Sequence, residues 1–266
     1  MATQQVHGAE LWYSDVGSGP PLVLVHGFPL DSRMWDGQAA DLSRSYRVIT
    51  PDLRGFGKSI SKDPFTIESL ADDLHALLSR IDALPCRLAG LSMGGYVCLA
   101  YAKKYPMDLR ALLLVDTRAE GDSTQDRAAR DKMIALVRRS GADAIANEMM
   151  GKLIAEETVC HQPKVPERLR AIMEDCPPLT IEHALAAMRD REDQTSNLPS
   201  IPAPTLILVG ESDAITPPSR AQAMQELIPH SQLQIIAGAG HMSPMEKPAE
   251  VTHAMRQFLG RDCREN

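Results

Sequence analysis

The sequence predicts an α/β fold, with a mostly parallel sheet that is covered by helices on both faces and interrupted by an all-helical insertion. Short apolar runs alternate with helix-like runs over residues 1–117, and the alternation returns after residue 200. Strands joined by crossover helices produce this order. The 266 residues are 44% apolar, which suffices for one large domain of this kind.

The expected strands are short aliphatic runs that stand between turn signals, as is typical of strands buried on both faces. They are residues 7–15, 22–26, 46–50, 86–89, 111–115, 205–209 and 233–236. The expected helices are residues 34–42, 67–81, 94–104 and 248–259. Aromatic residues make up only 4% of the chain, so aliphatic side chains must build the core.

The middle of the chain differs from both flanks because it contains no convincing strand run. Amphipathic stretches predict four helices, at residues 126–139, 142–154, 166–175 and 181–189. An insertion at this point would cover the carboxyl edge of the sheet, where ligands bind in open α/β folds. We therefore expect a core made of residues 1–117 and 201–266, with residues 118–200 as a cap.

Composition and charge argue against several partners. The formal net charge is −7, whereas a nucleic-acid binder needs clustered Lys and Arg. No apolar run approaches the roughly 20 residues that span a bilayer, and residues 1–6 form no apolar signal segment. The five cysteines are scattered, without metal-ligand or disulfide spacing. We expect a cytoplasmic protein that binds a small molecule and needs no metal or cofactor.

A candidate nucleophile, Ser92, lies in the pattern Gly90-Leu91-Ser92-Met93-Gly94, between a predicted strand and a predicted helix. A sharp turn there would project the hydroxyl outward, and side chains at positions 90 and 94 would collide with neighbouring elements. The following helix N-terminus offers free N–H groups to an oxyanion. Ser92 could instead be a plain helix N-cap, but the flanking pattern favours the nucleophile.

A serine hydroxyl needs a base, and the base needs a carboxylate that orients it. His241 is the candidate base, because it stands in a glycine-flanked loop after the last predicted strand. The alternative is a histidine in a surface loop without a catalytic role. Asp213, after the strand at 205–209, is the favoured carboxylate. Asp116 and Glu211 also follow predicted strands and remain its rivals.

An enzyme that transfers acyl groups must also hold the oxyanion of a tetrahedral intermediate. One donor should be the backbone N–H of Met93, and the other should come from the loop after the strand at 22–26. We assign the N–H of Phe28, since Pro29 has none and only stiffens the loop. His26 is expected to be buried and to hold this loop through backbone hydrogen bonds.

Four motifs together resemble those of the α/β-hydrolase superfamily. They are H-G-F-P at 26–29, P-D-L-R-G-F-G-K-S at 51–59, G-L-S-M-G-G at 90–95 and G-A-G-H-M at 238–242. The order Ser, Asp, His is also that of this superfamily. Within it, the chain is similar to small bacterial carboxylesterases, to 3-oxoadipate enol-lactonases and, at Phe28-Pro29, to cofactor-free haloperoxidases. The resemblance implies an eight-stranded sheet, a triad of Ser92, His241 and Asp213, and no cofactor.

These features predict a serine hydrolase that cleaves a small carboxylic ester or lactone through an acyl-enzyme on Ser92. The alternatives are a 3-oxoadipate enol-lactonase, a perhydrolase or haloperoxidase-like activity, and a non-catalytic receptor of the same fold. Apolar side chains should line the substrate pocket, although methionines at helical spacing are more often ordinary core. The candidates are Pro29, Met149, Met150, Leu153, Met188 and Met242. Arginines that could suit an acidic lactone are Arg127, Arg130, Arg138, Arg139 and Arg189.

Overall fold

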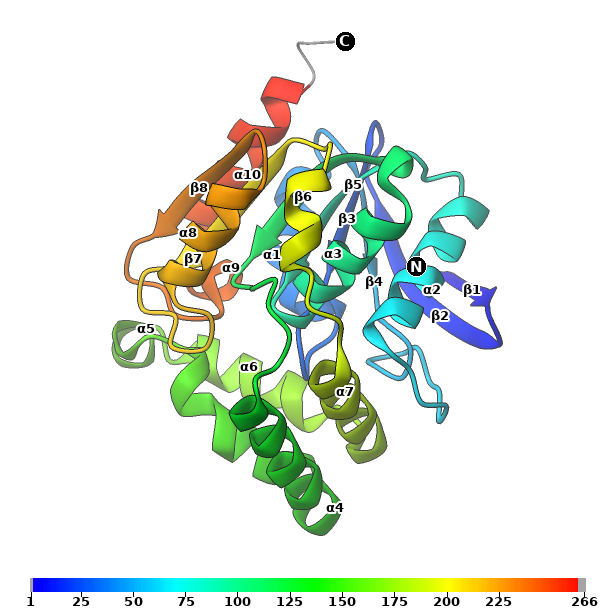
Figure 1. The fold of residues 1–266 in the computed structure, drawn as a ribbon. Coiled ribbons are helices and arrows are strands. Elements are labelled where there is room, and N and C mark those ends of the chain that lie inside the picture. Colours follow the sequence, from blue (N-terminus) through cyan, green and yellow to red (C-terminus); the bar gives the residue numbers. More distant parts are fainter. Residues whose placement is uncertain (1, 263–266) are drawn as a thin grey trace.

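The computed structural model describes residues 2–262, which form one eight-stranded sheet with helices on both faces (Figure 1). The strand order is β1-β2-β4-β3-β5-β6-β7-β8. The strands are β1 (Ala2–Val6), β2 (Ala9–Val16), β3 (Pro21–Val25), β4 (Arg47–Pro51), β5 (Cys86–Leu91), β6 (Leu109–Val115), β7 (Thr205–Gly210) and β8 (Ser231–Ile236). Only β2 pairs antiparallel, with β1 and β4, so the predicted mostly parallel sheet is confirmed.

The helices of the core pack against the sheet in two layers. They are α1 (Asp36–Leu42), α2 (Ile67–Arg80), α3 (Met93–Lys104), α8 (Pro218–Leu227), α9 (Ser243–Glu246) and α10 (Pro248–Asp262). Buried residues of α2, α3 and α8 share one apolar cluster, and those of α1 and α10 share the other. The sequence did not predict α8, because only Ala221 and Met224 of that helix are buried.

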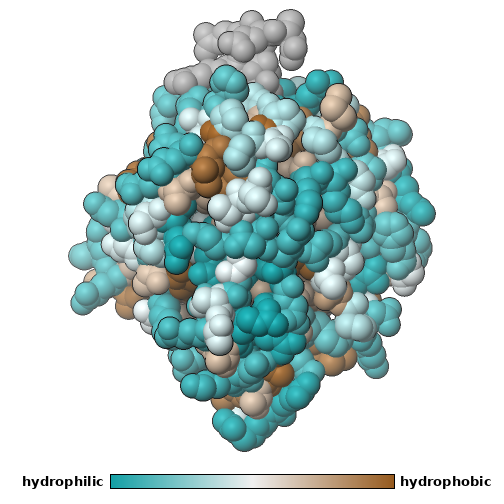
Figure 2. Space-filling model, viewed as in Figure 1, coloured by the Kyte–Doolittle hydropathy of each residue, from teal (hydrophilic) through white to brown (hydrophobic). Residues whose placement is uncertain are grey.

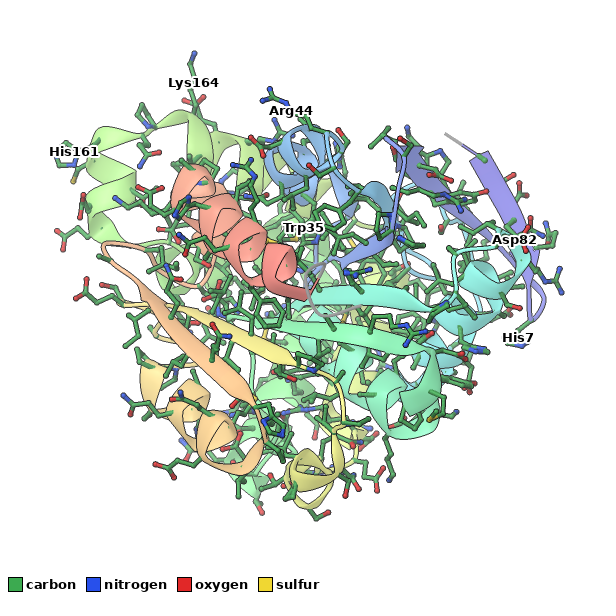
Figure 3. All side chains as sticks on the ribbon, turned by 90° about the horizontal axis from the view of Figure 1, so that it is seen from above. His7, Trp35, Arg44, Asp82, His161 and Lys164 are labelled. Carbon is green, nitrogen blue, oxygen red and sulfur yellow. The ribbon has the colours of Figure 1, made fainter. Side chains whose placement is uncertain are left out.

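Successive side chains of the central strands face opposite layers. In β3, Val23 and Val25 join the cluster of α2 and α3, whereas Leu22 and Leu24 join the cluster of α1 and α10. The period of two residues in a strand produces this alternation. Figure 3 shows the labelled Trp35, a fully buried side chain of the second cluster, in the interior beside α10.

The N-terminal strand expected over residues 7–15 is in fact the second strand of a hairpin. His7 and Gly8 have φ angles of 42° and 79° and form the turn between β1 and β2. Such left-handed backbone is typical of tight hairpin turns. The sequence of β1 is polar and only its Val6 is buried, so apolar patterning could not reveal it.

Four helices stand between β6 and β7 and lie together at one end of the sheet (Figure 1). They are α4 (Thr124–Leu153), α5 (Glu156–His161), α6 (Lys164–Glu174) and α7 (Pro178–Asp190). Two of the predicted helices form the halves of α4, which bends at Gly141, where φ is 75°. The short helix α5 was not predicted. We keep residues 118–200 as the proposed limits of a cap.

The surface seen in Figure 2 is mainly hydrophilic, and its hydrophobic residues form small separate patches. Within residues 2–262, no helix combines the length and the apolar character that crossing a bilayer requires.

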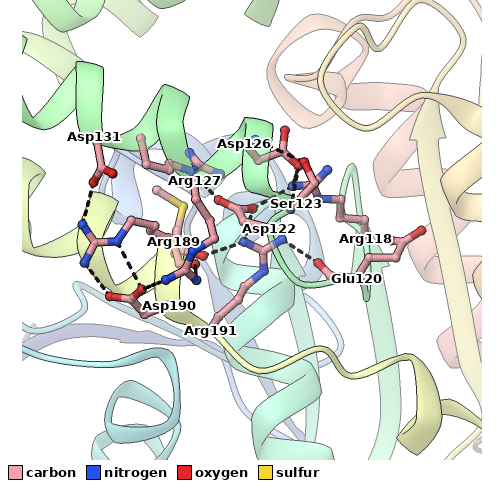
Figure 4. A network of polar contacts seen from close by, with 12 residues as sticks. Arg118, Glu120, Asp122, Ser123, Asp126, Arg127, Asp131, Arg189, Asp190 and Arg191 are labelled. Atoms are coloured by element: carbon pink, nitrogen blue, oxygen red, sulfur yellow. Dashed lines mark hydrogen bonds and ion pairs between the residues drawn. The ribbon is translucent and has the colours of Figure 1, made fainter.

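A cluster of arginines and carboxylates joins the two ends of the helical segment at residues 118–200 to its first long helix (Figure 4). The fully buried carboxylate of Asp122 accepts hydrogen bonds from Arg118 (2.8 Å), Arg130 (3.0 Å) and Arg191 (2.5 Å). Burial by itself would raise the pKa of Asp122, but the arginines hold it below its usual range. One carboxylate thus joins the segment after β6, helix α4 and the segment after α7.

Replacing Asp122 with Asn should lower the free energy of unfolding by about 3 kcal/mol, since removing one partner leaves buried charges uncompensated. Asp131 pairs with Arg189 but is 58% exposed, so Asp131→Asn is a matched control that should cost less than about 1 kcal/mol. Denaturant unfolding of both variants provides the comparison. Equal losses for the two substitutions would contradict the structural role assigned to Asp122.

Candidate active site

Ser92 occupies a strained turn between β5 and α3. Its φ and ψ angles are 53° and −113°, outside the regions that residues with side chains normally adopt. Strain of this kind persists only where the surroundings enforce it, and it concentrates at functional sites. The side chain is half-buried, so the hydroxyl has access to a ligand.

Neighbouring glycines allow this turn to pack closely. A Cβ atom on Gly90 would lie 2.3 Å from the carbonyl oxygen of Gly94, and one on Gly94 would lie 2.4 Å from that of Val25. Both distances are too short for any side chain. The collisions expected at positions 90 and 94 are therefore present, and they involve the start of α3 and the end of β3.

His241 connects Ser92 to a carboxylate. Its Nε2 lies 2.9 Å from Oγ of Ser92, and its Nδ1 lies 2.8 Å from Oδ2 of Asp213. A carboxylate only accepts hydrogen bonds, so Nδ1 carries the proton and Nε2 accepts from the hydroxyl of Ser92. The side chains of His241 and Asp213 are 3% and 0% exposed. The structure thus brings together three residues that follow β5, β7 and β8.

Both carboxylate oxygens of Asp213 accept hydrogen bonds from the turn that follows it. Its Oδ1 accepts the backbone N–H groups of Ile215 and Thr216, each at 2.8 Å, and its Oδ2 accepts the hydroxyl of Thr216 at 2.7 Å. Burial would raise the pKa of Asp213, but hydrogen bonds from His241 and Thr216 and the charge of His241 hold it below the ordinary value. Thr216 was not predicted from the sequence, although an Asp that bonds the backbone two or three residues ahead is a common turn signal.

The rival carboxylates point elsewhere. Asp116 is fully buried, and its oxygens accept the N–H of Gly210 (2.8 Å) and the hydroxyl of Ser243 (2.5 Å). Burial, followed by the nearby Asp213, raises the pKa of Asp116 well above its usual value. Glu211 accepts the N–H of Gly238 at 3.0 Å. Among the described residues, Asp213 alone offers His241 a carboxylate.

The loop after β3 lies beside Ser92. A Cβ atom on Gly27 would be 3.4 Å from Cβ of Ser92, which places the next residue, Phe28, at the same edge. Within residues 2–262, no hydrogen bond uses the backbone N–H of Phe28 or of Met93. Both groups are therefore free for a ligand atom near Ser92. Pro29 is buried in the same loop.

His26 holds this loop in the way the sequence suggested. Its Nδ1 donates to the carbonyl of Gly27 (2.9 Å), and its Nε2 accepts the N–H of Leu53 (3.0 Å). The ring is 0% exposed and packs edge-on against Phe56. Burial lowers the pKa of His26, an effect that the bond to Gly27 opposes. A neutral His26 is the form that makes both bonds.

The candidate pocket residues occupy different environments. Leu153, Met188 and Met242 are at most 2% exposed and belong to the apolar clusters. Met149 and Met150 are half-buried, and Met149 contacts both clusters. The N–H of Met242 donates to the carbonyl of Leu153 at 3.1 Å, so the end of α4 meets the loop of His241. Their role in substrate binding remains a prediction.

Comparison with known proteins identifies the family. Residues 20–248 match the family model described as alpha/beta hydrolase fold. This match spans most of the chain, so the protein belongs to the α/β-hydrolase family and is a hydrolase. It resembles bacterial esterases and enol-lactonases in particular.

Three solved structures illustrate the resemblance. A thermophilic esterase from Thermogutta terrifontis, solved with malate bound, is 44% identical, with a TM-score of 0.94 over 98% of this chain and 97% of that one. The enol-lactonase from Burkholderia xenovorans LB400 is 25% identical, with a TM-score of 0.91 over 97% and 100%. A bromoperoxidase from Bacillus anthracis is 27% identical, with a TM-score of 0.86 over 95% and 96%.

The buried neutral His26 should make stability depend on pH. The unfolded chain takes up a proton at its His near pH 6.5, whereas the folded chain resists it because the pKa of His26 is lowered. The free energy of unfolding should therefore be fully retained above about pH 6.5 and fall below it, by up to about 1.4 kcal/mol per pH unit. Denaturant unfolding at about pH 7.5 and about pH 5.5 measures this loss.

His26→Asn is the comparison variant, because it cannot titrate in this range. It should be less stable at neutral pH but should show a shallower loss on acidification. Identical pH dependence in the two proteins would show that folding does not change the pKa of His26.

Proposed function

We propose that this hydrolase is a serine esterase that cleaves small neutral carboxylic esters through an acyl-enzyme on Ser92. The observation that carries the proposal is the line of two hydrogen bonds, from Ser92 to His241 and from His241 to Asp213. A base oriented by a buried carboxylate is what activation of a serine hydroxyl requires. The free N–H groups of Phe28 and Met93 support it, because Met93 directly follows Ser92 and Gly27, the neighbour of Phe28, packs against Cβ of Ser92.

In the proposed mechanism, Oγ of Ser92 attacks the ester carbonyl carbon while Nε2 of His241 takes the hydroxyl proton. The carbonyl oxygen becomes an oxyanion that accepts hydrogen bonds from Phe28 and Met93. The bond to the leaving oxygen then breaks, and His241 returns the proton to the alcohol. A water activated by His241 attacks the acyl-enzyme next, and Ser92 recovers its proton as the acid leaves.

Charge pairing in the cap favours neutral substrates. Five arginines between residues 118 and 200 were considered for an acidic lactone. Four of them bond carboxylates of the same segment, and Arg139 lies exposed on the surface. The pairs are Arg127 with Asp190, Arg130 with Asp122, Arg138 with Glu182, and Arg189 with Asp131 and Asp190. A substrate carboxylate would have to displace one of these partners. The candidate pocket side chains, in contrast, are all apolar.

Hydrolysis of an acidic enol-lactone is the second candidate, and the structural likeness to the Burkholderia enol-lactonase supports it. The malate in the Thermogutta esterase also bears on it, because malate is a dicarboxylate. The same acyl-enzyme attacked by hydrogen peroxide in place of water would yield a peracid, the perhydrolase alternative that the likeness to a bromoperoxidase supports.

Replacing Ser92 with Ala should lower kcat for p-nitrophenyl acetate by on the order of 10⁶-fold, since the acyl-enzyme can no longer form. Ser45 is exposed, so Ser45→Ala serves as the matched control and should keep full activity. Thermal unfolding verifies that both variants are folded. Turnover by Ser92→Ala, or a wild type that fails to react with a fluorophosphonate probe, would refute the mechanism.

A substrate panel separates the candidates. We expect kcat/KM for neutral acetyl and butyryl esters to exceed that for an acidic enol-lactone. Added malate should inhibit the hydrolysis of the neutral esters only weakly. Both expectations follow from the paired arginines. A strong preference for the acidic lactone would instead indicate the enol-lactonase, and peracid formation from acetate and peroxide would indicate the perhydrolase.

A further inference from the structure

A second buried carboxylate, that of Glu246, accepts hydrogen bonds from the backbone of the loop that carries His241. Glu246 stands five residues after His241 in α9 and is 1% exposed. Its Oε1 accepts the backbone N–H groups of Gly240 (2.9 Å) and Met242 (3.1 Å), which are the two residues that flank His241. The backbone on both sides of the imidazole is therefore bonded to one oxygen atom.

The other oxygen of Glu246 is bonded to the cap. Its Oε2 accepts the backbone N–H of Ala155 (2.9 Å) and the hydroxyl of Thr158 (2.7 Å), both at the start of α5. These partners are 91 and 88 residues away in the sequence, so only the tertiary fold brings them to Glu246. One side chain thus bridges the candidate base and the cap.

Close backbone packing surrounds this bridge. A Cβ atom on Gly240 would lie 2.6 Å from the backbone nitrogen of Ala155, so residue 240 must be glycine for the cap segment to approach. The N–H of Met242 also donates to the carbonyl of Leu153 at 3.1 Å. Residues 153–158 therefore pack directly on the backbone that carries His241.

We propose that Glu246 is a positioning residue, whose carboxylate fixes the backbone on both sides of His241 and makes the position of the imidazole depend on residues 153–158 of the cap. The inference rests on the proposed role of His241 as general base. Four donors converge on two oxygens, an arrangement that a carboxylate satisfies and a neutral amide cannot, because half of an amide donates.

Glu246→Gln tests the positioning role. Glutamine keeps the size of the side chain but turns an NH₂ group toward one of the two donor pairs. We expect kcat for p-nitrophenyl acetate to fall by about 10²-fold, the effect of a misplaced reacting group, with a smaller change in KM. Glu157→Gln is the matched control, because Glu157 also lies at this junction but is 58% exposed and bonds Lys247. It should leave kcat unchanged.

A readout beyond turnover separates positioning from general loss of structure. The rate at which a fluorophosphonate labels Ser92 should fall in parallel with kcat, while the cooperative thermal unfolding of Glu246→Gln is retained. The downfield proton resonance of the bond between His241 and Asp213 should also shift or broaden. A folded Glu246→Gln protein with wild-type kcat and labelling rate would overturn the inference, while an active wild type and inactive Ser92→Ala would leave the proposed function intact.

Thr158→Val tests the link to the cap, and does so even if Glu246→Gln fails to fold. Valine keeps the shape of threonine and removes one donor, on the cap side alone. We expect kcat to fall by about fivefold, which corresponds to the net contribution of one hydrogen bond. An unchanged kcat and an unchanged resonance in Thr158→Val would overturn the dependence of His241 on the cap.

Discussion

The close approach of the turn after β5 to the end of β3 is the constraint on which the candidate site depends. The backbone atoms of Gly94 lie so near the carbonyl of Val25 that no side chain fits between them. This contact keeps Ser92 in its strained conformation and brings Gly27 against its Cβ atom. The candidate nucleophile, the first turn of α3 and the loop of Phe28 are therefore placed by one packing contact, which would pre-organise the proposed oxyanion site.

Buried carboxylates supply the second layer of organisation, and their surroundings shift their pKa values in opposite directions. Donors from His241 and Thr216 lower the pKa of Asp213, whereas burial and the proximity of Asp213 raise that of Asp116. A like charge nearby disfavours ionisation of a carboxylate, whereas hydrogen bonds to its charged form favour it. Both effects favour the negative charge on Asp213, next to the imidazole that becomes positive during the proposed reaction. Asp116 instead joins the end of β7 to Ser243, just past His241.

Local patterns in the sequence predicted much of this arrangement and favoured Asp213, but they could not show which partners the rival carboxylates bond. Aliphatic runs located the strands, and the glycines around Ser92 located the turn, because both signals act within a few residues. Asp116 and Asp213 each follow a strand, and their different roles depend on the backbone of the turn. Asp116 has a φ angle of 45°, and its carboxylate bonds Gly210 and Ser243 rather than His241.

Glu246 shows why other parts of the site could not be predicted. Nothing in the nearby sequence marks it, since half of its partners come from the cap, about a third of the chain away. The strand β1 and the helix α5 were missed for a related reason. Both elements are short, and β1 is also polar. Tertiary contacts stabilise them, so they leave no clear periodic pattern in the sequence.

Charge pairing in the cap connects stability with specificity. Arg130 helps Asp122 to join α4 to the segments after β6 and α7, and Arg127 and Arg189 bond Asp190 at the end of α7. Arginines used in this way are not free to receive a substrate carboxylate, and releasing one would leave a partner unpaired. In the proposed esterase, these pairs remove positive charge from substrate recognition. Discrimination among substrates would then depend on the shape of apolar surface, which distinguishes acyl groups by only a few kcal/mol at most.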